Sequence, residues 1–114
     1  NFATILAARA AQNCAGSPPP FRCMVLLSPT LPGYVTQFPE LFATPLRTPA
    51  LVGFCKDDPI IKEGPTEHSK LWTADSYHRM EHSGPGHRPL PSAKDEVAAI
   101  SSRILAFLAE HCPQ

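Results

Sequence analysis

Two short, wholly apolar runs constrain the fold of this 114-residue chain more than any other feature of its sequence. They cover residues 23–27 (Cys-Met-Val-Leu-Leu) and 50–54 (Ala-Leu-Val-Gly-Phe), and turn-forming residues bound both. Strands that are apolar on both faces are typical of a parallel sheet with helices packed on each side. We therefore expect both runs to be buried strands of an α/β fold, within one small domain.

Three segments outside these runs have the apolar spacing or the capping residues of helices. They are residues 1–12, residues 67–74, which Thr66 can cap, and residues 92–110.

The last of these helices carries the strongest signals. Ser92 and Asp95 have the spacing of a capping box at its start. An apolar stripe follows at helical spacing, formed by Val97, Ile100, Ile104, Leu105 and Leu108. We expect this stripe to face the sheet.

Two further segments complete the order of elements. Prolines interrupt residues 28–48, so we expect a long loop there, with one helical turn at residues 40–43. Residues 76–82 alternate aromatic and long side chains and form a weak candidate for a third strand. This order predicts a short parallel sheet flanked by helices. Because so few strands make a poor sheet on their own, we expect residues 1–114 to be the later part of a larger α/β domain.

Charge and hydropathy argue against two classes of partner. Ten Lys and Arg residues balance ten Asp and Glu residues, whereas proteins that bind nucleic acid usually carry a basic patch. No apolar run approaches the ~20 residues of a membrane span. We therefore expect neither nucleic-acid binding nor membrane insertion. Residue 1 is Asn rather than Met, so we expect the native start, with any targeting signal, to lie outside this sequence.

The four cysteines are Cys14, Cys23, Cys55 and Cys112, and no two of them form a C-x-x-C pair. A zinc ribbon or a C-x-x-C redox motif is therefore disfavoured. Cys23 and Cys55 lie in or beside the apolar runs, where free cysteine packs as a small hydrophobic residue. We favour buried thiols and a cytoplasmic protein, with two disulfides in a secreted chain or a functional thiol as the alternatives.

Two polar segments could carry chemistry. Asp57 and Asp58 follow the second apolar run, and sites in open α/β sheets lie beyond the carboxyl ends of strands. His87 lies in a glycine-containing loop before the last helix, and a histidine beside a carboxylate can accept a proton near neutral pH. Taken alone, an Asp-Asp-Pro segment is more often a solvated turn, and a histidine in such a loop is more often an exposed residue without a catalytic role. Together they follow the Ser…Asp…His order of the α/β-hydrolase triad.

Other polar residues form weaker constellations. His78 and His82 would share one face of a strand and, with His87, offer an alternative metal site. Ser17 follows a helix, and Ser28 runs directly into a proline, so neither lies in the G-x-S-x-G turn of a nucleophile. The sequence thus has a candidate acid and a candidate base but no candidate nucleophile.

Three segments, taken in order, resemble the fungal-type serine hydrolases of the FSH family. They are Val25-Leu26-Leu27-Ser28 with Leu31-Pro32, residues 49–61 and residues 82–89. The family includes the ovarian-cancer-associated candidate hydrolase of animals and thioesterases that release polyketide chains in fungi. Residues 1–9 are similar to the helix that follows the nucleophile in that family. The resemblance covers nearly the whole chain but only the later part of a family domain.

This resemblance implies an α/β-hydrolase fold and a Ser-Asp-His triad that acts on short or medium acyl esters or thioesters, with no cofactor and no metal. Asp58 matches the triad acid, with Asp57 as a near rival, and His87 matches the base, although Pro85 separates the two glycines before it. His82 matches a recurrent loop histidine with a structural role. Residues 28–49 would line the acyl pocket.

The nucleophile serine and the oxyanion loop of the family have no counterpart in residues 1–114. We therefore expect this chain alone to be inactive, as the later part of an esterase or thioesterase. The alternatives are a truncated, non-catalytic remnant of the same fold and, from another class, a small histidine-based metal-binding or interaction module.

Overall fold

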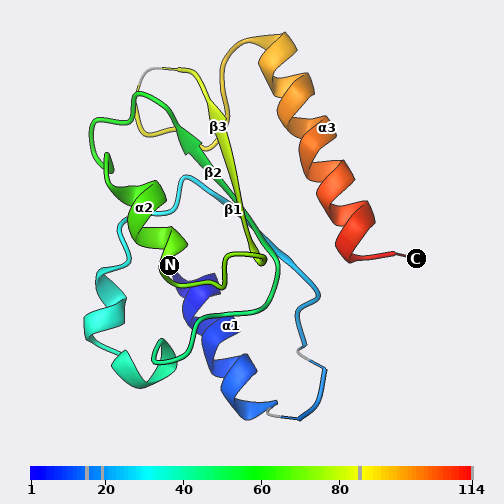
Figure 1. Ribbon diagram of the computed structural model, residues 1–114. Helices are drawn as coiled ribbons and strands as arrows, with labels where there is room; N and C mark the ends of the chain where they lie inside the picture. The colour runs from blue at the N-terminus through cyan, green and yellow to red at the C-terminus, as the bar shows by residue number, and fades with distance from the viewer. Residues whose placement is uncertain (15, 19, 85, 114) are drawn as a thin grey trace.

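The computed structural model describes residues 1–14, 16–18, 20–84 and 86–113. Its centre is a three-stranded sheet built from β1 (Met24–Leu27), β2 (Ala50–Cys55) and β3 (Tyr77–His82). The strands lie in the order β1-β2-β3, and both pairs are parallel (Figure 1). The expected α/β architecture, a short parallel sheet flanked by helices, is therefore confirmed.

The middle strand, β2, is the most buried element of the sheet. All six of its residues are buried, and Ala50 pairs with Met24 on one side and with Tyr77 on the other. Because side chains alternate between the faces of a strand, β2 contributes to two separate apolar clusters. Its wholly apolar sequence is what allows it to lie between two strands and two layers of helices.

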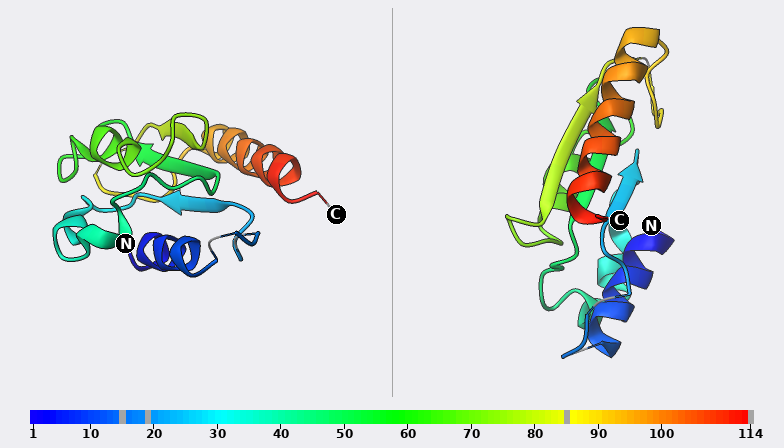
Figure 2. Two further views of the ribbon diagram at one scale, coloured as in Figure 1. Left: turned by 60° about the horizontal axis from the view of Figure 1, so that its bottom comes forward. Right: turned by 90° about the vertical axis from the view of Figure 1, so that its right-hand side faces the viewer.

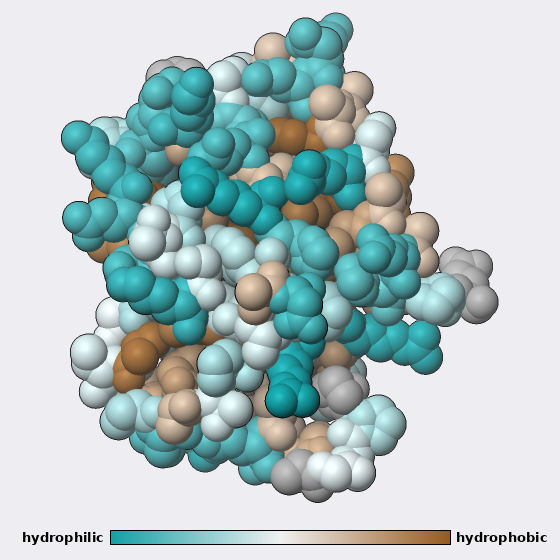
Figure 3. All heavy atoms as spheres, viewed as in Figure 1, coloured by the Kyte–Doolittle hydropathy of each residue, from teal (hydrophilic) through white to brown (hydrophobic). Residues whose placement is uncertain are grey.

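Helices cover both faces of the sheet. The larger cluster packs α1 (Phe2–Asn13) and the segment after α2 (Gly64–Ser69) on one face, and α3 (Lys94–His111) covers the other (Figure 2). The side seen in Figure 3 is mostly hydrophilic, with apolar side chains showing only in small patches. No helix in the described part of the chain has the length and apolar character needed to cross a membrane.

The cluster under α3 is small and tightly fitted. Its buried members are Leu51, Met80, Ile100 and Phe107. Gly53 belongs to this face of β2, and a Cβ atom at Gly53 would lie only 2.9 Å from the terminal methyl of Met80. Glycine at this position therefore lets the Met80 side chain lie directly against the sheet.

Helix boundaries differ from the sequence expectations at two capping residues. Helix α2 begins at Gly64 and ends at Ser69, and its N-cap is Glu63, so Thr66 does not cap it. Helix α3 has Ala93 as its N-cap and no side-chain cap, so the expected capping box is also absent. The hydroxyl of Ser92 instead accepts a hydrogen bond from Arg88.

The apolar stripe of α3 is shifted relative to the expectation. Leu105 is 66% exposed, whereas Phe107, which the expected stripe omits, is buried against the sheet. In the loop before β2, the chain forms two short 3-10 turns, Gly33–Thr36 and Pro39–Leu41, rather than one turn at residues 40–43.

Candidate active site

Asp58 lies in the turn that directly follows β2, and only 4% of its side chain is exposed. Its Oδ1 accepts hydrogen bonds from the backbone N–H groups of Ile60 (2.8 Å) and Ile61 (3.2 Å). Its own backbone N–H donates to the carbonyl of Cys55, 3.3 Å away. The turn thus fixes the carboxylate at the carboxyl end of the central strand, as Asp side chains in such turns often do.

His87 meets the other oxygen of this carboxylate. Its Nδ1 lies 2.6 Å from Oδ2 of Asp58, although 29 residues separate the two in sequence. They come together because β2 and β3 are parallel neighbours, so the segments that follow them leave the same edge of the sheet. Since an ionised carboxylate only accepts hydrogen bonds, Nδ1 carries the proton and Nε2 keeps its lone pair in the neutral imidazole.

The electrostatics of Asp58 favour its ionised form. Burial raises the pKa of Asp58, but the hydrogen bonds from His87, Ile60 and Ile61 together outweigh burial and hold this pKa below its ordinary value. The charged carboxylate can hold the ring of His87 in one orientation. The His87 side chain is 29% exposed, so its ring lies close enough to solvent to meet a reacting group.

The two candidate acids are distinguished by their surroundings. Asp57 is exposed, whereas Asp58 is buried and contacts His87. Asp58 is therefore the carboxylate that this arrangement can use.

The alternative metal site is not assembled. His78 and His82 lie on the α3 face of β3, where His78 packs edge-on against Phe107 and His82 is buried beside the carbonyl of Ser83. His87 lies apart from them, with Asp58. Among the described residues, no three His, Cys, Asp or Glu side chains are grouped so that they could hold a metal ion.

Ser28 and Cys55 contact the loop that carries His87, and the sequence analysis does not predict these contacts. The Ser28 hydroxyl, at the end of β1, donates to the carbonyl of Arg88, and the Cys55 thiol donates to the carbonyl of Gly84 at 2.9 Å. The only sequence signal is their place at the ends of strands that neighbour the histidine loop. Ser17 lies in the exposed segment after α1. Ser28 follows β1, but the next element is a short 3-10 turn that begins only at Gly33, so neither serine lies in a tight turn from a strand into an α-helix.

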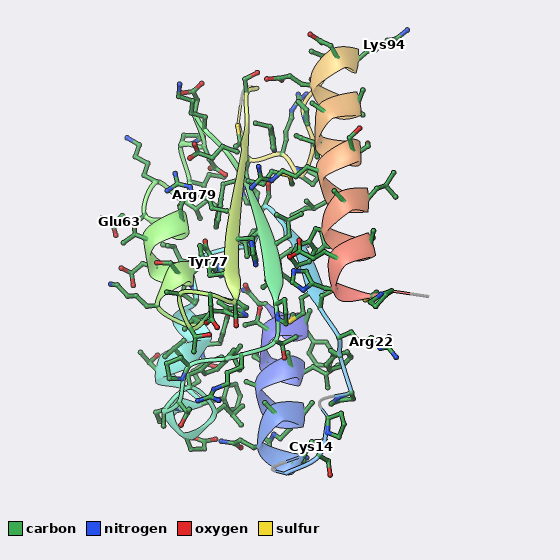
Figure 4. The ribbon with its side chains drawn as sticks, turned by 45° about the vertical axis from the view of Figure 1, so that its right-hand side comes forward. Cys14, Arg22, Glu63, Tyr77, Arg79 and Lys94 are labelled. Atoms are coloured by element: carbon green, nitrogen blue, oxygen red, sulfur yellow. The ribbon has the colours of Figure 1, made fainter. Side chains whose placement is uncertain are left out.

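Two cavities include parts of residues 28–49, the segment that we expect to line the acyl pocket. One cavity, about 670 Å³, lies between α1 and residues 40–49. Its wall includes Cys14, at the opposite end of the molecule from Lys94 (Figure 4). Pro49 also lines it, and the six residues of β2, about 20 Å of chain, separate Pro49 from the site. Residues 28–30, together with Asn1 and residues 25–27, line a second hollow of about 310 Å³ at the carboxyl end of β1.

The site is thus one polarised acid–histidine pair at the carboxyl edge of a parallel sheet. Protein-family models, curated protein sequences and solved structures were each compared with this chain, and none of the three comparisons finds a match.

Proposed function

We propose that Asp58 and His87 are the acid and the base of a serine hydrolase that acts on short or medium acyl esters or thioesters. The 2.6 Å contact between Nδ1 of His87 and Oδ2 of Asp58 carries this proposal. In a Ser-His-Asp triad, the lone pair on Nε2 takes the proton of the serine hydroxyl and later gives it to the leaving group. A buried, ionised aspartate on Nδ1 is the partner that this step requires.

The topology supports the same proposal. The acid follows β2 and the histidine follows β3, in the chain order of the α/β-hydrolase triad. Both side chains lie beyond the carboxyl ends of parallel strands, where sites of open α/β sheets occur. On this proposal the substrate is a small acyl compound. We propose a cytoplasmic protein, in which the four cysteines remain reduced.

The attacking serine comes, in this proposal, from residues other than 1–114. Ser17 and Ser28 both lack the strand-to-helix turn that presents a nucleophile. Acyl transfer also needs N–H donors for the oxyanion. Chain 1–114 alone therefore does not turn over esters, and it forms the later part of an α/β-hydrolase domain.

The test uses the longest chain that the gene encodes, with chain 1–114 as its control. We expect a fluorophosphonate probe to label the longer chain, which should also hydrolyse p-nitrophenyl butyrate. His87→Ala and Asp58→Asn should each lower kcat by about 10³-fold, because base and tautomer control are lost. Asp57→Asn is the matched control and should leave kcat within about twofold, because Asp57 is exposed.

Near-full activity of both Asp58→Asn and His87→Ala would discard the site. A longer chain that folds but is neither labelled nor active would favour the non-catalytic remnant. Stoichiometric zinc that is lost when His82 and His87 are both changed to Ala would favour the metal-binding module.

A further inference from the structure

His87 lies in the connection between β3 and α3, whose described residues, 83–84 and 86–93, include no helix or strand. Gly84 and Gly86 have φ of +141° and +79°. Such a loop has many accessible conformations, so its backbone must be held if the imidazole is to stay on Asp58. Side chains from the ends of the other two strands hold it on both sides of His87.

The first of these side chains is Ser28, immediately after β1. Its φ is +47°, the only positive φ of a non-glycine residue among the described residues. Glycine adopts such a conformation without the strain that a Cβ atom brings, so the backbone alone gives no reason for serine here. What serine adds is its hydroxyl, which donates to the carbonyl of Arg88, the residue after His87. The Ser28 backbone N–H donates to Gly53 at 2.8 Å and so fixes this residue to β2.

The second is Cys55, the last residue of β2. Its side chain is buried, and its Sγ lies 2.9 Å from the carbonyl oxygen of Gly84, three residues before His87. The next residue, Lys56, donates its backbone N–H to the carbonyl of His82 at 2.8 Å, so β2 and β3 are still paired where the loop begins. The thiol therefore ties the start of the histidine loop to the strand whose following turn carries Asp58.

We infer that Ser28 and Cys55 are positioning residues for His87: their hydroxyl and thiol hold the carbonyls of Arg88 and Gly84 and thereby keep the imidazole on Asp58. Neither contacts the reacting atoms. The importance of this clamp for turnover rests on the proposed function, but the orientation of His87 can be measured without turnover.

The test follows the tautomer of His87 by ¹⁵N NMR of the imidazole in chain 1–114 near pH 8. In the unmodified chain we expect a single tautomer with the proton on Nδ1, because the carboxylate of Asp58 accepts it. Ser28→Gly removes the hydroxyl and also relieves the strained φ, so it should keep thermal stability while His87 becomes a mixture of tautomers. If Ser28→Gly changes the tautomer of His87 without lowering the thermal stability of the chain, Ser28 positions His87 rather than only stabilising the fold.

Cys55 offers a second pair of variants. Cys55→Ala should also give mixed tautomers, whereas Cys55→Ser keeps a donor of similar size and should preserve the single tautomer. Exposed Ser102 and the distant Cys14 supply the controls Ser102→Ala and Cys14→Ser, which should leave His87 unchanged. In the longer, active chain, Ser28→Gly should lower kcat about tenfold with little change in KM, because the base is misplaced rather than removed.

A single tautomer that persists in both Ser28→Gly and Cys55→Ala would overturn the inference, as would equal effects of the control variants. An unmodified chain that itself shows mixed tautomers would overturn it as well. Failure of the proposed function looks different, because an intact Asp58–His87 contact in a longer chain without activity would contradict the hydrolase and leave the clamp in place.

Discussion

His68 and His87 each donate a hydrogen bond to an oxygen atom, but the surroundings of the two imidazoles differ. His68, on α2, is fully buried between Phe54 and Trp72, and its Nε2–H donates to the carbonyl of Thr30 at 2.7 Å. His87 is partly exposed, and its Nδ1–H donates to the carboxylate of Asp58. One imidazole is part of the apolar core, and the other lies at the edge of the sheet.

The difference shows which property makes a histidine a candidate base. Burial lowers the pKa of His68 more than its hydrogen bond to Thr30 raises it, so His68 stays neutral and joins α2 to the loop after β1. His87 has a carboxylate as its hydrogen-bond partner and a side chain that reaches solvent. The partner and the access to solvent, rather than the residue type, distinguish the two.

Replacing the buried histidine should have the largest effect on stability. His68→Ala removes a side chain packed between two aromatic rings and leaves a cavity, so we expect the free energy of unfolding to fall by about 3 kcal/mol. His87→Gln, at the partly exposed site, should change it by less than about 1 kcal/mol. Urea denaturation measures both, and equal losses would contradict the division between a packing histidine and a site histidine.

Replacing the acid should have an intermediate effect. Asp58→Ala removes the acceptor for two backbone N–H groups and for His87, so we expect a loss of about 2 kcal/mol. The exposed neighbour provides the matched variant, since Asp57→Ala should cost less than about 0.5 kcal/mol. Denaturation curves that place the two aspartate variants together would show that the turn does not depend on the Asp58 carboxylate.

The smallest effect should be the dependence of stability on pH, and the two residues act in separate pH windows. The folded-state pKa of His68 is lowered, so its unfolded form binds a proton more readily, and stability falls as the pH drops below about 6.5. The folded-state pKa of Asp58 is also lowered. Its contribution to the free energy of unfolding is therefore fully present above about pH 3.8, the ordinary pKa of aspartate, and is lost as the pH falls through the folded-state pKa.

Thermal unfolding between pH 8 and pH 3 measures both windows. The step below pH 6.5 should diminish in His68→Gln and persist in His87→Gln. The same step in both variants would show that another group causes it.

The first two strands were predictable because each is a short run of consecutive apolar residues, which can be recognised in the sequence without knowledge of the tertiary fold. The apolar runs at residues 23–27 and 50–54 match β1 and β2 to within one residue at each end. The start of α2 was not predictable from Thr66 alone, because Pro65 suits the first turn of a helix and the chain becomes helical earlier. The exposure of Leu105 depends on the angle at which α3 meets the sheet, which no short pattern records.

The acid–histidine contact was predictable for a different reason. Parallel strands place the segments that follow them at one edge, so an aspartate after β2 and a histidine after β3 lie close together by topology. The contacts of Ser28 and Cys55 depend instead on the path of an irregular loop. A path of that kind follows from tertiary packing, and neighbouring residues do not encode it.

The two oxygens of Asp58 are tied to different parts of the chain, one to its own turn and the other to a distant loop. The hydrogen bonds of Oδ1 within its own turn therefore orient the carboxylate without help from the distant loop. A protein engineer could exchange the loop for one of another length or composition and still find the carboxylate facing the same way. In such exchanges the sequence around His87 can be redesigned while the orientation of its carboxylate partner is preserved.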